Sequence, residues 1–430
     1  MRQMKDSGYE WLGEVPANWG VYPARYAFTE NRTKNINGEV TKALQFKFGS
    51  IIPKTNFDAE SDEYVADTIA TYTIVDPRTI MINGLNLNYD FKTLRVGMVT
   101  ERGVITSAYL ALIPDERVIN AEFATLLFKG YESVMAFHNM GAGIRKTLGF
   151  KEFKNQPILI PPLQEQQRIV EFLQGKLGEI DAVIEQTRDT VEEYKRLKQT
   201  VITEAVTKGV RGEREMKYSG NEWISDIPAE WNISRIKYIC EFEPLSDKAH
   251  LDAESLITYT PMECIKNGWF INNTAQFGSV SSSLTAYQDG DIVMAKVTPC
   301  FENGNIAVMC GLSSGFGLGS SELFVFRATQ IETRYLFYWL RNDRFVQTAC
   351  STMTGTGGLK RVSPSFVKNC YIHLPPVEEQ RNIVEYLDSM CAEFDRLIDA
   401  KNHLLSELES YRKSVVYEYV TGKKEVPACP

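Results

Sequence analysis

Long apolar runs, an export signal and paired cysteines are all lacking in this chain of 430 residues. No stretch of 18 apolar residues occurs, so we expect no membrane span. Residues 1–6 contain no apolar core, so we expect no signal peptide. The eight cysteines are scattered from Cys240 onward without a CxxC pair. They indicate reduced thiols in a cytoplasmic protein, and neither a disulfide frame nor a zinc site.

Catalytic motifs are equally scarce. The four histidines lie far apart, which argues against a histidine-based metal centre, and no Walker A sequence occurs. Both Pro-Pro pairs follow an aliphatic residue, Ile160 or Leu374, where an adenine-N6 methyltransferase needs Asp or Asn to hold the amino group. Asp115 and Glu152 formally fit a loose nuclease pattern, PD…ExK. We therefore expect no catalytic site and no metal, with a nuclease built on these two carboxylates as the enzymatic alternative.

The acidic net charge of −8 does not exclude a nucleic-acid partner, because the acidic excess is unevenly placed. Residues 20–160 contain 16 basic and 15 acidic side chains, and residues 232–374 contain 12 of each. Any basic face on these two segments must therefore be local. Net charge alone neither supports nor excludes DNA binding.

The chain does contain an internal repeat. Residues 161–207 align with 375–421 without a gap, so that PPLQEQ at 161–166 corresponds to PPVEEQ at 375–380. Upstream, SGYEWLGEVPANW at 7–19 corresponds to SGNEWISDIPAEW at 219–231, and these two Trp boxes hold four of the six tryptophans. About 140 less similar residues separate each box from its Pro-Pro pair. A duplicated frame with two divergent inserts is suited to reading two different targets.

Two long helices are predicted where proline is absent, at 163–227 and 377–426. Each proline-free stretch opens just after a Pro-Pro pair and with acidic residues, as a helix start favours. Apolar residues then recur at steps of three and four, which predicts an antiparallel coiled coil, with a shift through Leu197 and Val201 in the first helix and Tyr411 and Val415 in the second. The alternative is two unrelated helices, each covering its own domain. The predicted seam consists of Leu177, Ile180, Ile184, Val191, Tyr194, Phe394, Ile398, Leu405 and Leu408.

The two inserts have mixed α/β patterns. We expect strands at 64–75, 79–88, 104–112, 291–297, 305–309 and 322–327, and short helices at 121–137 and 334–349. A Gly-rich loop with basic residues follows each helix, at 140–146 and 354–361. Glycine lets a backbone approach phosphate closely, and Arg or Lys can neutralise it or read guanine. The predicted DNA-binding residues are Gly141, Gly143, Arg145, Lys146, Thr147, Gly355, Gly357, Lys360 and Arg361.

Each of these motifs also has a plainer interpretation. The Gly-rich loops could be tight turns with solvated basic residues, although their recurrence at equivalent places favours a site. The Trp boxes favour packing of the chain entry against a core, with partner docking as the alternative. The predicted fold class is thus two α/β (α+β) domains joined by two long helices, with a pseudo-twofold repeat. We expect domains at 1–162 and 214–376, and spacer helices at 163–213 and 377–424.

Two repeats, each with a Trp box, a variable insert, a Pro-Pro-x-x-Glu-Gln stretch and a long helix, resemble the specificity subunit of type I restriction–modification systems. The resemblance covers essentially the whole chain and rests on residues 7–19, 161–173, 219–231 and 375–387. It implies two target recognition domains that each read one half of a split DNA site, with the helices setting the gap.

The same resemblance implies a division of labour in phage defence. Two methyltransferase subunits and the restriction–translocase subunits would be the partners and would carry the catalysis, adenine-N6 methylation included. S-adenosylmethionine, ATP and magnesium would then bind to those partners and not to this chain. The non-enzymatic alternative is a coiled-coil scaffold with two protein-binding modules, which would be indifferent to DNA at any salt concentration.

Overall fold

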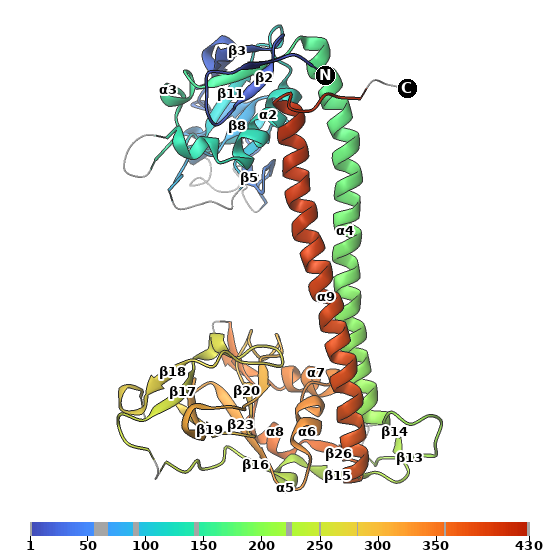
Figure 1. Ribbon diagram of the computed structural model, residues 1–430. Coiled ribbons are helices and arrows are strands. Elements are labelled where there is room, and N and C mark those ends of the chain that lie inside the picture. The colour runs from blue at the N-terminus through green and yellow to red at the C-terminus, as the bar shows by residue number, and fades with distance from the viewer. Residues whose placement is uncertain are drawn as a thin grey trace. The chain divides into compact units, whose positions relative to one another are not determined.

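The computed structural model describes residues 2–55, 68–88, 94–141, 146–220, 226–248, 251–281, 283–356 and 358–427 (Figure 1). It divides into unit 1, Met1–Arg188 with His403–Pro430, and unit 2, Asp189–Asn402. Two long helices contribute to both units, namely α4 (Leu163–Lys208) and α9 (Val377–Val420). No helix in the described part of the chain is long and apolar enough to cross a membrane.

The core of unit 1 is an antiparallel four-stranded sheet with the order β4-β11-β8-β9. Its central strands β8 and β11 are short apolar runs. Strand β8 is buried throughout, whereas Ile113 of β11 is 45% exposed. Helix α2 packs on this sheet, and Asn120 caps it by accepting a hydrogen bond from the backbone N–H of Phe123 at 2.9 Å. The bounds are β4 (Phe28–Glu30), β8 (Ile80–Ile82), β9 (Val96–Met98), β11 (Leu110–Pro114) and α2 (Ala121–Ser133).

Antiparallel two-stranded pairs surround the sheet of unit 1. They are β1 (Met4–Asp6) with β2 (Glu14–Pro16), β3 (Gly20–Pro23) with β12 (Pro157–Ile160), β5 (Leu44–Lys47) with β6 (Ser50–Pro53), and β7 (Thr73–Val75) with β10 (Gly103–Ile105). The short helices are η1 (Ala24–Tyr26), η2 (Ala136–Asn139) and α3 (Phe150–Phe153). The pairing of β3 with β12 brings the two ends of the insert together, next to the start of α4.

Unit 2 repeats this architecture. Its sheet β16-β23-β20-β21 has the same strand order, and β15–β26 and β13–β14 repeat the flanking pairs. The repeat-related pairs Gly20↔Ile160 and Asn232↔Leu374 show that even the strand register is retained. The bounds are β13 (Met216–Tyr218), β14 (Asp226–Pro228), β15 (Asn232–Arg235), β16 (Cys240–Phe242), β20 (Ile292–Ala295), β21 (Ile306–Val308), β23 (Leu323–Ala328) and β26 (Tyr371–Leu374).

The two units differ in what surrounds the common sheet. Unit 2 adds a second four-stranded sheet, β18-β17-β22-β19, and a hairpin of β24 and β25. The added strands are β17 (Leu256–Thr260), β18 (Thr274–Gln276), β19 (Thr285–Gln288), β22 (Phe316–Gly319), β24 (Thr354–Thr356) and β25 (Leu359–Arg361). The helices are α5 (Ile236–Ile239), η3 (Met262–Cys264), η4 (Phe277–Ser279), η5 (Ser313–Gly315), α6 (Thr333–Trp339), α7 (Asp343–Ser351) and α8 (Pro364–Asn369).

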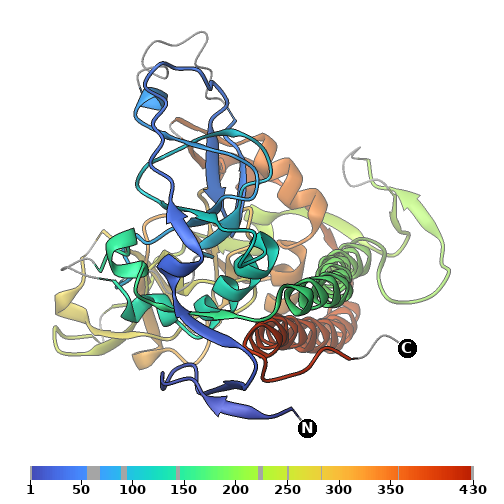
Figure 2. The same ribbon diagram turned by 90° about the horizontal axis from the view of Figure 1, so that it is seen from above.

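Parts of α4 and α9 lie side by side and antiparallel within each unit (Figures 1 and 2). In unit 1, the rings of Phe172 and Tyr419 are 4.7 Å apart, and Asp181 and Arg412 form an ion pair further along. In unit 2, the rings of Tyr194 and Phe394 are 6.4 Å apart. These packings, together with the two α/β units, confirm the predicted fold class.

The predicted seam residues differ in burial. Leu177, Ile180, Ile184 and Val191 are buried, and Leu405 and Leu408 pack against the core of unit 1. The remaining three, Tyr194, Phe394 and Ile398, are half-buried.

The predicted shift of the seam through Leu197 and Val201, and through Tyr411 and Val415, is confirmed for the two valines, because Val415 is buried and Val201 is half-buried, but it is wrong for Leu197 and Tyr411. The side chains of Leu197 and Tyr411 are 44% and 49% exposed. Four residues after Tyr194, the position that faces the other helix is occupied by Lys198 and not by Leu197. The ammonium group of Lys198 pairs with Asp395 at 2.6 Å across the helices. The repeat-related Arg412 makes the same contact with Asp181 in unit 1. A long basic side chain can cover the seam with its stem while its charged head reaches the facing helix.

Four predicted elements also needed correction. The strand expected at 104–112 is two strands in different sheets, β10 and β11. The helix expected at 334–349 is two helices, because Asn342 caps α7 by accepting a hydrogen bond from the backbone N–H of Phe345 at 3.0 Å. Of the strand expected at 64–75, only β7 is a strand, and residues 64–67 lie outside the described part. The strand expected at 79–88 ends at Ile82, where the chain turns toward Gly84.

Candidate nucleic-acid interface

The Trp box of unit 1 is tied to the start of α4 by a cluster of three side chains. Trp19 is 1% exposed, and the guanidinium carbon of Arg2 lies 5.0 Å from its ring centroid. Arg2 also forms an ion pair with Glu165, the glutamate of the first Pro-Pro-x-x-Glu-Gln stretch, at 2.7 Å. The cation therefore bridges an aromatic face and the acidic first turn of the helix.

Unit 2 repeats this cluster with equivalent residues. Trp231 is fully buried, Arg214 lies 5.2 Å from its ring centroid, and Arg214 pairs with Glu379 at 2.6 Å. One contact differs: the indole N–H of Trp231 donates to Glu379 at 3.0 Å, whereas Trp19 Nε1 has no partner among the described residues. The packing role predicted for the two boxes thus holds for Trp19 and Trp231. Trp223 lies outside the described residues.

The glutamine of each stretch connects the long helix to the short helix on the sheet. Gln166 Oε1 accepts a hydrogen bond from the backbone N–H of Asn120, the cap of α2, at 2.7 Å. Gln380 Oε1 accepts one from the backbone N–H of Glu332, the cap of α6, at 2.8 Å. Each amide also donates to the carbonyl of the first proline of its own stretch, at 2.8 Å. The motif therefore fixes each insert on its long helix.

The first predicted DNA-binding loop is followed by Leu148, which packs on residues 83–85, a segment that the sequence predicted only as part of a strand. The backbone N–H of Leu148 donates to the carbonyl of Gly84 at 2.9 Å, and a Cβ at Gly84 would lie 2.3 Å from the Leu148 carbonyl. The buried Arg95 holds this segment by donating to the carbonyls of Asn83 and Leu85 at 2.9 and 2.8 Å. No local pattern in the sequence signals this support, because it depends on the burial of the Arg95 guanidinium.

The loop runs from the buried Met140 to an accessible basic residue, Lys146. Lys146 and Thr147 are exposed, and Gly141 approaches the carbonyl of Lys146 so closely that a Cβ would lie 3.0 Å away. Lys146 has a positive φ of 40°, which is uncommon for a residue other than glycine. The predicted residues Gly143 and Arg145 lie outside the described part of the chain.

The second predicted loop is a β-hairpin. β24 and β25 pair from Thr354↔Arg361 to Thr356↔Leu359, with Gly355 at a φ of 150° and Gly358 at 82°. Gly357, at the turn between the strands, lies outside the described residues. Lys360 is exposed, so the hairpin presents a basic side chain to solvent.

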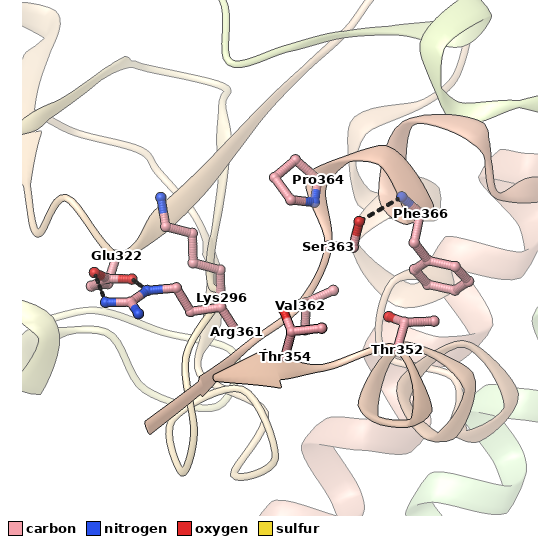
Figure 3. Close-up of a pocket in the computed structure, with 9 residues that line it drawn as sticks. All are labelled: Lys296, Glu322, Thr352, Thr354, Arg361, Val362, Ser363, Pro364 and Phe366. Atoms are coloured by element: carbon pink, nitrogen blue, oxygen red, sulfur yellow. Dashed lines mark hydrogen bonds and ion pairs between the residues drawn. The ribbon is translucent and has the colours of Figure 1, made fainter. Parts of the chain in front are cut away.

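Arg361 is not available in the way that the sequence indicated. Its guanidinium is bound by both oxygens of Glu322, at 2.7 and 2.8 Å, beside an open pocket of about 650 Å³ that Lys296 also lines (Figure 3). The hydrogen bond from Arg361 lowers the pKa of Glu322. The pair is therefore charged on both sides, and a DNA phosphate would have to replace Glu322 to engage Arg361.

The two carboxylates of the nuclease alternative are engaged locally. Asp115 is bound by the exposed Arg117, and this contact lowers its pKa to about 2. Glu152 accepts a hydrogen bond from the backbone N–H of Gly149 at 3.2 Å, in the first turn of α3. In the described part of the chain, no three His, Cys, Asp or Glu side chains are grouped to hold a metal ion.

Comparison with known proteins identifies a matching protein family. A model of the type I restriction modification DNA specificity domain matches residues 96–193 and 228–410. The specificity subunit of type I restriction enzyme EcoEI from Escherichia coli is 30% identical over 46% of this chain and 34% of its own length. The specificity subunit of type I restriction enzyme MjaVIII from Methanocaldococcus jannaschii is 24% identical over 85% of each chain. Thus the chain spans only about a third of the EcoEI relative.

A solved structure shows the same fold. It comes from work on complex assembly and conformational transition of the type I R-M system, and it aligns with a TM-score of 0.69. The alignment covers 95% of this chain and 99% of that chain at 15% sequence identity.

Proposed function

The chain belongs to the type I restriction modification DNA specificity family, and from this premise we propose that it is the DNA sequence-specificity subunit of a type I restriction–modification complex. The observation that supports this role most strongly is the duplicated frame. In each unit an Arg–Trp–Glu cluster and a glutamine fix an insert on the paired long helices. The frame is constant while the inserts differ, as expected for a protein that reads two different half-sites at a fixed separation.

Each insert reads one half of a bipartite site in double-stranded DNA. The second sheet and the β24–β25 hairpin occur in unit 2, whereas unit 1 has separate strand pairs around its sheet. Different surfaces present different hydrogen-bonding groups to the base edges, so the two half-sites differ in sequence. Lys146 and Lys360, which are exposed and repeat-related, are the basic residues proposed to contact DNA from the two loops.

Catalysis belongs to the partners in this proposal. Two methyltransferase subunits bind S-adenosylmethionine and methylate an adenine in each half-site, and the restriction subunits use ATP and magnesium. The target adenine is flipped out of the stack into the partner's pocket, because chemistry on a stacked base is blocked. This chain selects the adenine that is presented. Its own Pro-Pro pairs follow Ile160 and Leu374, strand residues that cannot hold the adenine amino group.

The long helices set the number of base pairs between the half-sites. Adding one helical turn to both α4 and α9 lengthens the pair by about 5.4 Å. We expect the spacer of the methylated motif to change by one or two base pairs, while both half-sites keep their sequence. A control with four substitutions and no insertion in the same stretch should keep the original motif. If the lengthened chain still methylates the original spacer, the helices do not act as the ruler.

The test of the function itself is the map of N6-methyladenine in cells that express this chain with its methyltransferase partner. Cells with the partner alone are the control. We expect a new split motif with two short unlike halves and a fixed gap. No change in methylation, with the partner shown to be active through another specificity subunit, would refute the proposal. Exchanging the insert of unit 2 for one from a relative should change one half-site and leave the other.

A further inference from the structure

The internal repeat permits a comparison of surfaces as well as cores. Several residues retained in both units are buried, among them Trp19 and Trp231 of the Arg–Trp–Glu clusters and the glutamines Gln166 and Gln380. One retained aromatic residue is different, because Tyr26 is 54% exposed and its counterpart Tyr238 is 61% exposed. Packing within the unit does not explain why an exposed tyrosine is kept at the same place twice.

In unit 1 this tyrosine belongs to a small basic patch, defined as Arg25, Tyr26, Lys154 and Asn155. The backbone N–H of Arg25 donates to the carbonyl of Lys154 at 2.9 Å, which joins η1 to the residues just after α3. The guanidinium of Arg25 also donates to the side-chain oxygen of Asn155. Arg25 and Asn155 are exposed, so this basic group faces solvent. The group is called patch 1.

In unit 2 the equivalent positions hold Lys237, Tyr238, Lys368 and Asn369, called patch 2. The ammonium group of Lys237 donates to Asn369 Oδ1 at 2.9 Å and lies 5.1 Å from the Tyr238 ring centroid. All four residues are exposed. The cation–asparagine contact of patch 1 therefore recurs, although an arginine has become a lysine.

The charge of both patches is not paired with a carboxylate in the described part of the chain. Among the described residues, none of the four cations has a carboxylate oxygen within 4.0 Å, whereas the exposed Arg78 is held by Glu116 and Glu122. The apolar part of the surface is not retained: Tyr22 stacks on Tyr26 at 4.6 Å, but its counterpart is Ser234. What the two units share is therefore positive charge, a phenol and an amide. These are the side chains that contact phosphate oxygens.

We propose that patches 1 and 2 bind the sugar–phosphate backbone of DNA, one patch at each half-site. This inference rests on the proposed function and adds the surface that positions each insert without reading bases. The phosphate backbone is the same for every sequence, whereas base edges differ. Residues that contact phosphate can thus stay alike in two units whose base-reading loops have diverged. An acidic protein surface is the competing partner, and the experiment distinguishes it.

The test uses the complex of this chain with its methyltransferase partner, on a duplex containing the mapped motif and on a scrambled duplex. Arg25→Gln/Lys154→Gln removes both cations of patch 1, and Lys237→Gln/Lys368→Gln removes those of patch 2. The plot of log affinity against log salt concentration has a negative slope, and each lost phosphate contact should make this slope shallower by about 0.9. Raising salt fourfold should then weaken the wild-type complex about 12-fold more than either double variant. The ratio of specific to scrambled binding should stay the same.

Two further variants serve as controls. Arg25→Lys/Lys154→Arg keeps both charges and should restore the wild-type slope, which excludes a folding defect as the cause. Lys195→Gln/Arg196→Gln removes two exposed charges from α4 and should leave the slope within about 0.3 of the wild-type value, because no phosphate contact is lost.

Two outcomes would overturn the phosphate-binding inference, and a third would overturn the proposed function. An unchanged slope in both patch variants overturns the inference. Loss of the methyltransferase subunit from the purified complex, with an unchanged slope in what remains, overturns it in favour of a protein-docking surface. If the wild-type complex itself fails to prefer the mapped motif, the proposed function fails, whatever the patch variants do.

Discussion

Glu379→Ala should destabilise unit 2 far more than Glu165→Ala destabilises unit 1, although the two glutamates are repeat-related. The side chain of Glu379 is 2% exposed and that of its partner Arg214 is 12% exposed. Removing Glu379 leaves the nearly buried Arg214 with one ion-pair partner, the 42% exposed Glu230 at 2.9 Å, and the indole N–H of Trp231 loses its acceptor. Breaking a buried ion pair by removing one partner costs about 3–5 kcal/mol.

Glu165 sits in a wetter cluster. Its side chain is 23% exposed and that of Arg2 is 17% exposed, so water can solvate the cation after truncation. Trp19 Nε1 has no acceptor among the described residues, so no indole hydrogen bond is lost. We expect about 1–2 kcal/mol, between the ranges for exposed and buried pairs.

Amide hydrogen exchange with peptide-level detection is the appropriate assay, because it follows the two units separately in one chain. Peptides from 226–242 and 371–385 report on unit 2, and peptides from 14–30 and 157–171 report on unit 1. Glu379→Ala should lower protection on the order of 100- to 5,000-fold, and Glu165→Ala about 5- to 30-fold. Glu379→Gln, which keeps an acceptor but loses the charge, should fall between wild type and Glu379→Ala. Equal losses in the two units, or a larger loss for Glu165→Ala, would refute the reasoning from burial and the indole bond.

Three other predictions follow from single contacts. Burial lowers the pKa of His373 to about 3. Between about pH 6.5 and pH 3 this imidazole is protonated in the unfolded chain but neutral in the folded chain. The free energy of unfolding should therefore fall by up to about 1.4 kcal/mol for each pH unit of acidification in that range. His373→Leu should flatten that slope in urea titrations from pH 4 to 7, and an unchanged slope would contradict the assignment. Lys198→Asp should destabilise unit 2 by about 0.5–1 kcal/mol and Asp395→Lys should restore it, as a double-mutant cycle would show; no coupling would mean that the pair does not hold the helices in register. A Cβ at Gly317 would lie 2.1 Å from the ring of a buried tyrosine, so Gly317→Ala should destabilise by about 1–3 kcal/mol in thermal melts, whereas Gly175→Ala, in open space on α4, should stabilise by up to about 1 kcal/mol.

The elements that could be predicted from the sequence obey local rules. The absence of proline after residues 162 and 376, with apolar residues at steps of three and four, is enough to predict α4 and α9. The internal repeat is visible because the same short strings recur. The bounds of β7 and β8 were predicted less accurately. Their extent depends on turns in the chain, such as the one near Gly84, and the alternation of apolar and polar residues does not signal a turn.

The candidate site shows where such reasoning ends. The Gly-rich loop was enough to identify Arg361 as a candidate. Its partner Glu322 lies 39 residues away in the sequence, so no local pattern predicts the ion pair. The segment held by Arg95 was not identified, because its role follows from burial of the guanidinium among carbonyls. Lys198 and Arg412 were passed over in the seam because a charged residue does not count as apolar.

The sequence by itself determined the duplicated frame, the two long helices and the divergence of the two inserts, because repetition, proline and helical periodicity act over short stretches of chain. The tertiary structure decided what the repeated residues do. Glu165 and Glu379 each pair with an arginine more than 160 residues earlier in the chain, Glu379 also accepts from Trp231, and Gln166 reaches the cap of α2. It also decided which cations stay uncompensated, because an ion pair depends on which side chains folding brings within a few ångströms, a distance that no local pattern in the sequence encodes.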